Sequence, residues 1–107
     1  MDDLTKEQKF LLVSMYKEVL SRQPALSTEK ANYFDDSNEV QALFMPHLSS
    51  DYVSYLCWKL QSKGYIQCYP GDDLSNEIQL TDETIVYMEN RFSNNIKELF
   101  NLLLKLK

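Results

Sequence analysis

Hydroxyl and ammonium side chains recur between residues 49 and 63, at spacings that suit the outer face of a helix. Such groups donate hydrogen bonds to anionic oxygens, so the chemistry open to them is contact with phosphate rather than a covalent reaction. Serines at a helix start also lie beside free backbone amides, which attract anions. Tyrosines add phenols and apolar rings, and lysines add positive charge. The residues concerned are Ser49, Ser50, Tyr52, Tyr55, Lys59 and Lys63.

The same stretch lacks the side chains that distinguish bases most directly. It has no arginine for a bidentate contact to guanine and no asparagine for adenine, and Gln61 lies toward one edge of the predicted helix. Ordinary solvent exposure on the outside of a core helix would produce the same pattern. Contact with a nucleic acid and simple solvation therefore both remain open at these positions.

Catalysis and metal binding find little support in the residues. His47 is the sole histidine, so no pair of imidazoles is available for a dyad or a metal site. Cys57 and Cys68 lack CxxC spacing, which favours two reduced thiols in a cytoplasmic protein. Glycine-rich phosphate loops and hydrolase motifs are absent. We expect no enzymatic activity, no cofactor and no metal.

Length and charge limit the classes of protein to which the chain can belong. The 107 residues fit one domain, and the net charge is −5. Residues 1–50 hold five basic and eight acidic side chains, and residues 51–107 hold six and eight. This balance disfavours strong nonspecific binding to nucleic acid but allows a local basic patch. The charged start and the lack of a long apolar run predict no signal peptide and no contact with membranes.

Several helix starts carry capping signals. Thr5 and Gln8 form a capping box that predicts a first helix extending to about residue 21. Ser27 or Thr28 begins a short helical turn within residues 27–34. Asp36 and Glu39 again have capping-box spacing, and this second helix ends before Pro46. The next helix begins at residue 49 or 50 and ends at Gly64, where glycine suits a left-handed cap.

The chain after residue 64 predicts a hairpin and a final helix. Residues 65–69 and 77–80 alternate as two strands, and the sequence PGDDLSN supplies the turn between them. Thr81 caps a helix of about residues 82–107, with a break at residues 93–95 as an alternative. Apolar residues repeat along it at nearly heptad spacing. This stripe packs on the domain's own core or holds a dimer together, and we expect an interface of Phe92, Ile96, Leu99, Leu103 and Leu106.

The sequence also resembles a known family. The phrases YLCWKLQSKGYI, residues 55–66, and IQLT, residues 78–81, resemble winged helix-turn-helix regulators of the MarR and PadR kind. LTDETIVYMEN is similar to small winged-helix proteins of the YjcQ type. The resemblance implies a mainly α fold with a small two-stranded β-wing, an α+β arrangement. It implies a helix-turn-helix at about 36–63, a wing at about 65–80 and a long C-terminal helix at about 82–107.

Two functions follow from this resemblance and from the charge. The first is a dimeric transcription regulator that reads double-stranded DNA with helix 50–63. However, the wing tip carries Asp72, Asp73 and Glu77 where such regulators usually have arginines. The second is therefore a protein-binding module, an adaptor or antirepressor, whose acidic and aromatic surface docks a partner. Trp58, the only tryptophan, either packs on the core or anchors such an interface.

Overall fold

The computed structural model describes residues 1–93 and 95–106, which form six helices and a three-stranded antiparallel sheet. The elements in chain order are α1 (Lys6–Ser21), α2 (Thr28–Ala31), β1 (Phe34–Asp36), α3 (Ser37–Phe44), α4 (Ser50–Ser62), β2 (Ile66–Gly71), β3 (Leu74–Leu80), α5 (Asp82–Phe92) and α6 (Ile96–Leu106). None of the helices in this described part is both long enough and apolar enough to cross a membrane.

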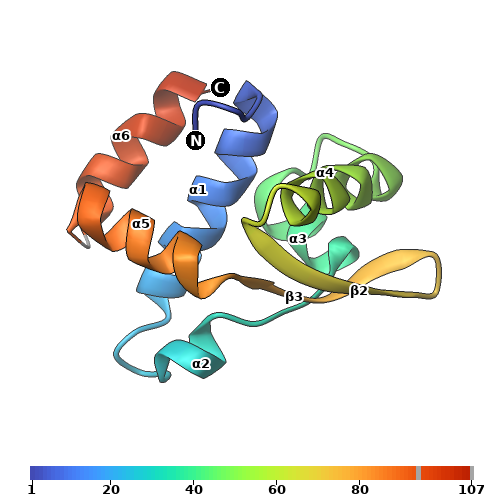
Figure 1. Cartoon of the computed structure of the whole chain (residues 1–107), viewed down its shortest axis with the longest axis horizontal. Coiled ribbons are helices and arrows are strands. Elements are labelled where there is room, and N and C mark those ends of the chain that lie inside the picture. Colours follow the sequence, from blue (N-terminus) through green and yellow to red (C-terminus); the bar gives the residue numbers. More distant parts are fainter. Residues whose placement is uncertain (94, 107) are drawn as a thin grey trace.

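Helix α1 is the centre of the molecule. Figure 1 shows α5 and α6 on one side of α1, and α3 and α4 on the other. The hairpin β2–β3 extends below α4 and beyond it, and the two chain termini lie near each other. The α1 side chains Leu11, Leu12, Val13 and Met15 have no measurable solvent exposure. A helix that is buried along its middle and has neighbours on both sides therefore organises the core.

The predicted helix caps are present. Thr5 and Gln8 satisfy each other's backbone amides, so the capping box at the start of α1 is confirmed. Asp36, Ser49 and Thr81 each accept a hydrogen bond from the amide three residues later, at the starts of α3, α4 and α5. Such side chains satisfy amides that have no partner within the helix.

The exit from α4 also follows the prediction. Gly64 has a φ of 85°, in the left-handed region that glycine adopts without strain. Its amide bonds the carbonyl of Gln61, and the amide of Tyr65 bonds the carbonyl of Leu60, which together form a Schellman motif. Thr81 Oγ1 then donates to the Gly64 carbonyl at 2.9 Å. The end of α4 and the start of α5 are thus fastened together.

The prediction of two strands was wrong, because the sheet has a third strand in the order β1-β3-β2. In β1, Phe34 lies opposite Ile78 and Asp36 opposite Asn76. Two of its three residues are aspartates, which are poor strand formers, so local propensity gave no signal. Pairing with β3 and burial of Phe34, which has no solvent exposure, form this strand instead.

Arg22 fastens this added strand to the end of α1. Its Nη1 donates to the carbonyls of Ala31 at 3.0 Å and Tyr33 at 2.9 Å. The guanidinium also lies 4.6 Å from the ring centroid of Phe34. One arginine therefore joins α1, α2 and β1 through both hydrogen bonds and a cation–π contact.

The hairpin turn is tighter than the sequence predicted. Gly71 pairs with Leu74, which leaves only Asp72 and Asp73 between the strands, with φ angles of 52° and 60°. Positive φ at both central residues is the pattern of a type I′ turn, whose twist matches that of the flanking strands. The side-chain Nδ2 of Asn76 donates to the carbonyls of Gly71 and Leu74 and closes the tip.

The single long C-terminal helix was also a wrong prediction, since the chain forms α5 and α6 instead. Ser93 ends α5 in the left-handed region with a φ of 48°, and Asn95 Oδ1 accepts a bond from the Glu98 amide in the first turn of α6. Residue 94 lies outside the described residues. The break at residues 93–95 allows α6 to turn back and pack on α1, where Leu99 is fully buried.

Candidate nucleic-acid interface

Helix α4 has one face in the core and one face in solvent. Val53, Leu56, Cys57 and Leu60 have at most 1 % of their surface exposed. The exposed side chains are Asp51, Tyr52, Tyr55, Lys59, Ser62 and Lys63. The apolar residues recur at helical spacing, so packing fixes the rotation of α4 and determines which side chains point outward.

The amino-terminal end of α4 combines a hydroxyl with free amides. Ser49 Oγ accepts the Tyr52 amide at 3.2 Å, which leaves the hydroxyl hydrogen free to donate outward. Ser50 is half-buried, and Pro46 and His47 in the preceding turn are exposed. An anionic oxygen approaching this end would meet the Ser49 hydroxyl and the positive end of the helix dipole.

Tyrosines and a lysine form a row along the exposed face of α4. The rings of Tyr52 and Tyr55 are stacked, with centroids 5.8 Å apart, and Lys59 Nζ lies 5.6 Å from the Tyr55 centroid. The Tyr52 hydroxyl donates to a carboxylate oxygen of Glu7 at 2.6 Å, and this bond raises the pKa of Tyr52 above its ordinary value. One predicted contact residue is therefore already paired with an acid from α1.

Lys63 is bound within the protein in a similar way. Its Nζ donates to the backbone carbonyl of Asp3 and to Gln8 Oε1. Beside it, the Tyr65 hydroxyl donates to Asp3 Oδ1 at 2.7 Å, which raises the pKa of Tyr65 to about 12 and lowers the pKa of Asp3. The segment before α1 thus covers the carboxyl-terminal end of α4.

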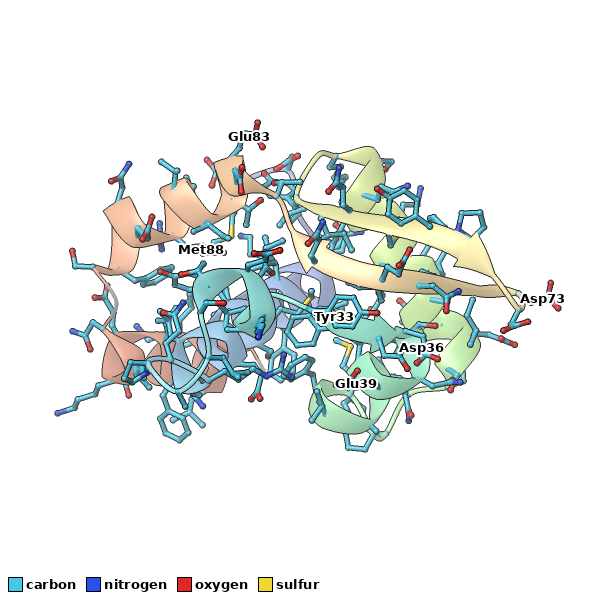
Figure 2. All side chains as sticks on the ribbon, turned by 90° about the horizontal axis from the view of Figure 1, so that it is seen from below. Tyr33, Asp36, Glu39, Asp73, Glu83 and Met88 are labelled. Atoms are coloured by element: carbon cyan, nitrogen blue, oxygen red, sulfur yellow. The ribbon has the colours of Figure 1, made fainter. Side chains whose placement is uncertain are left out.

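Figure 2 shows Asp73 at the far end of the hairpin, pointing away from the body of the protein. Asp72, its neighbour in the turn, is also exposed, and so is Glu77 on β3. Glu77 has a φ of 51° and lies where the pairing of β2 with β3 shifts register, which indicates a bulge. The hairpin therefore presents carboxylates and Tyr69, which is half exposed.

A second acidic region lies where β1 meets α3. Figure 2 shows Tyr33, Asp36 and Glu39 in this part of the molecule, on the edge of the sheet. Partial burial, and then the charges of nearby carboxylates with Asp35 first among them, raise the pKa of Tyr33. Tyr33 is 46 % exposed. Negative charge and aromatic surface thus occur together outside α4 as well.

The predicted site residues are brought together only in part. The hydroxyl, phenol and ammonium groups of residues 49–63 share one helix, but reasoning from the sequence missed Asp3 and Glu7, which lie against that helix. They precede their partners Tyr65 and Tyr52 by 62 and 45 residues, so no local pattern connects them. The only available signal was the acidic start of the chain, MDDLTKE.

The predicted interface residues in α5 and α6 are divided in the same manner. Phe92 and Leu99 are buried in the core of the single chain, and Leu103 and Leu106 are half-buried. Ile96 is 42 % exposed.

Comparison of the chain with protein-family models, with curated proteins and with solved structures gives no match.

Proposed function

We propose that this protein is a winged-helix DNA-binding regulator that inserts α4 into the major groove of double-stranded DNA. The observation that carries this proposal is the order α1-α2-β1-α3-α4-β2-β3, with the hairpin beside α4 and the outer face of α4 exposed. The major groove admits an α-helix, and helix-turn-helix proteins use their second helix in this way.

The side chains of α4 predict a modest affinity for DNA. Ser49 and the amides at the start of α4 would contact one phosphate, and Lys59, which lies over the Tyr55 ring, would contact another. Tyr52 and Tyr55 offer phenols to the backbone and rings to thymine methyl groups. The few free cations predict a weak dependence on salt, because each neutralised phosphate adds about one unit to the logarithmic slope.

A homodimer belongs to the same proposal. A two-fold dimer carries two copies of α4 and reads a palindromic site, so that the contacts of each half-site add. Figure 1 shows α4 and α6 on different sides of the molecule. A dimer formed through α6 would therefore leave both copies of α4 uncovered.

The test is a fluorescence-anisotropy titration with a duplex enriched from a random library. Lys59→Ala should weaken binding and lower the logarithmic salt slope by up to about one unit. Lys30→Ala is the matched control, because Lys30 is an exposed lysine on α2, away from α4. Equal affinities for these two variants would contradict a role for α4.

Asp73→Lys distinguishes this proposal from a second candidate. On DNA, the reversed charge at the hairpin tip should tighten binding with little gain in sequence discrimination, since a lysine there adds charge without reading base edges. The second candidate is a module that binds a basic protein. It is favoured by the hydrogen bonds of Tyr52 to Glu7 in α1 and of Lys63 to the Asp3 carbonyl, and by the carboxylates of the hairpin.

The second candidate predicts the opposite outcome for the same variant. Asp73→Lys should weaken a complex with a basic partner, because it removes one negative charge and adds a positive one. Trp58, half-buried at the edge of the core, would contribute to that interface, so Trp58→Ala should weaken the complex too. The sign of the change in affinity on Asp73→Lys decides between the two functions.

A further inference from the structure

Helix α6 is apolar on two sides, although it packs on the protein with only one. Leu99 is fully buried, and Leu102 and Leu103 pack at the margin of the core. On the adjoining side, Ile96, Phe100 and Leu104 have 42 %, 52 % and 52 % of their surface exposed. Exposed apolar patches of contiguous large side chains mark interaction surfaces more often than isolated exposed residues do.

These three side chains, which we call the outer stripe, are spaced by four residues. Successive members are therefore rotated by about 40° and together extend over about 12 Å of the helix. Phe100 lies at the middle, with one branched aliphatic residue at an equal distance on each side. Lys97, also exposed, lies on one flank of the stripe.

We propose that a second copy of this chain covers the outer stripe, with the two α6 helices antiparallel and Phe100 at the two-fold axis. The stripe is symmetric about its central residue, so the rotation that reverses the helix places Ile96 against Leu104 of the partner subunit and Phe100 against Phe100 of the partner subunit. A two-fold interface requires such self-complementarity, because the same surface must serve both sides. Antiparallel helices also oppose their dipoles, whereas parallel helices align them.

This interface differs from the one expected from the heptad spacing. The outer stripe shares only Ile96 with the predicted set, since Phe92 and Leu99 are used within the protomer. It deepens the dimeric part of the proposed function, because α4 lies away from α6 in Figure 1 and stays accessible in both copies. Its test uses no DNA, so failure of the interface and failure of DNA binding are separate results.

Sedimentation equilibrium of the full chain at micromolar concentration is the first test. The wild-type chain should sediment at twice the mass of one chain, and Phe100→Glu should halve that mass. Val86→Glu is the matched control, because Val86 is 54 % exposed on the neighbouring α5 and lies outside the stripe, so this variant should remain dimeric. Circular dichroism should show equal helix content in all three proteins, because both substituted residues are exposed.

Cysteine cross-linking tests the orientation. Phe100→Cys should form a disulfide with its own copy, whereas Ile96→Cys should cross-link efficiently only when mixed with Leu104→Cys. The native cysteines Cys57 and Cys68 are buried and should not compete. A monomeric wild-type chain, or a dimer that survives Phe100→Glu, would overturn the proposal. Self-cross-linking of Ile96→Cys at the rate of Phe100→Cys would overturn the antiparallel arrangement.

Discussion

The side chain of Asn32, two residues before β1, hydrogen-bonds to the backbone of Leu80 in β3 and so extends the sheet. Its Nδ2 donates to the Leu80 carbonyl at 3.0 Å, and its Oδ1 accepts the Leu80 amide at 2.8 Å. Asn32 is 7 % exposed, so water cannot readily replace these bonds. The carboxamide thus imitates a paired residue in a strand and joins two segments 48 residues apart.

Asn32→Ala should lower the free energy of unfolding by about 1–3 kcal/mol, because it leaves a buried amide and a buried carbonyl of Leu80 without partners. Urea denaturation measures this change. Asn90→Ala is the control, since Asn90 is exposed on α5 and alanine favours a helix. If the two variants lost equal stability, the paired bonds of Asn32 would carry no special weight.

The two cysteines are buried thiols rather than reactive ones. Burial raises the pKa of Cys57 to about 12 and that of Cys68 to about 11. Because thiolate is the reactive form, both should resist an aromatic disulfide reagent at about pH 8 in the folded protein and react after denaturation. Rapid labelling of either thiol without denaturant would contradict this.

The same shifts predict a loss of stability in alkali. The folded pKa of each thiol lies above the unfolded value of 9.0, so the protonated thiols favour the folded state. Their contribution is fully present below pH 9.0 and decreases as the pH rises toward the folded values. The melting temperature should accordingly fall between about pH 9 and pH 11, less steeply in a Cys57→Ala variant than in the wild type.

At the scale of elements, the junction between α5 and α6 carries the clearest difference between sequence and structure. Heptad spacing continued through residue 93, so periodicity alone favoured one helix. The deciding features are the left-handed Ser93 and the cap at Asn95. Short polar residues compete with helical bonding, which is why the break occurs in this stretch.

Ser93→Gly should therefore raise the free energy of unfolding by up to about 1 kcal/mol, since a left-handed conformation strains any residue with a Cβ. Ser93→Ala is the matched change and should lower it. In one continuous helix both signs would be reversed, because alanine favours a helix interior and glycine disfavours it. Urea denaturation of the two variants distinguishes the alternatives directly.

The predictable elements were those with local signals. Side-chain caps predicted four helix starts, at Thr5, Asp36, Ser49 and Thr81, and Gly64 predicted the end of α4. Strand β1 has no such signal, because its structure depends on pairing with β3. Contacts between residues far apart in the sequence gave no local signal either. The outward direction of Lys63 follows from helical spacing, whereas its bond to Gln8 depends on how α1 packs beside α4.

At the scale of the whole molecule, negative charge lies beside the proposed DNA-binding surface of α4. Glu7 lies on that surface through its bond to Tyr52. At roughly 7 Å in water, one such charge repels a phosphate by about 0.6 kcal/mol. On the proposed function, carboxylates that would weaken the attraction to DNA therefore lie beside the helix that would enter the major groove.

Glu7→Gln should tighten DNA binding by about threefold at low salt, because it removes this repulsion and retains an acceptor for the Tyr52 hydroxyl. Glu29→Gln changes the net charge equally, and Glu29 is exposed on α2, so its effect should be smaller. An equal gain from both variants would mean that only the total charge matters. Anisotropy titrations at two salt concentrations provide the comparison.

The bond between Lys63 and Gln8 joins the end of α4 to the first turn of α1. Gln8 Oε1 accepts from both the Thr5 amide and Lys63 Nζ, so one oxygen serves the helix cap and the lysine. A ligand that draws Lys63 away removes one of these bonds, and by reciprocity fraying of the cap releases Lys63. Hydrogen–deuterium exchange at the backbone amides of Thr5 and Gln8, at the start of α1, would consequently report whether a ligand is bound to α4.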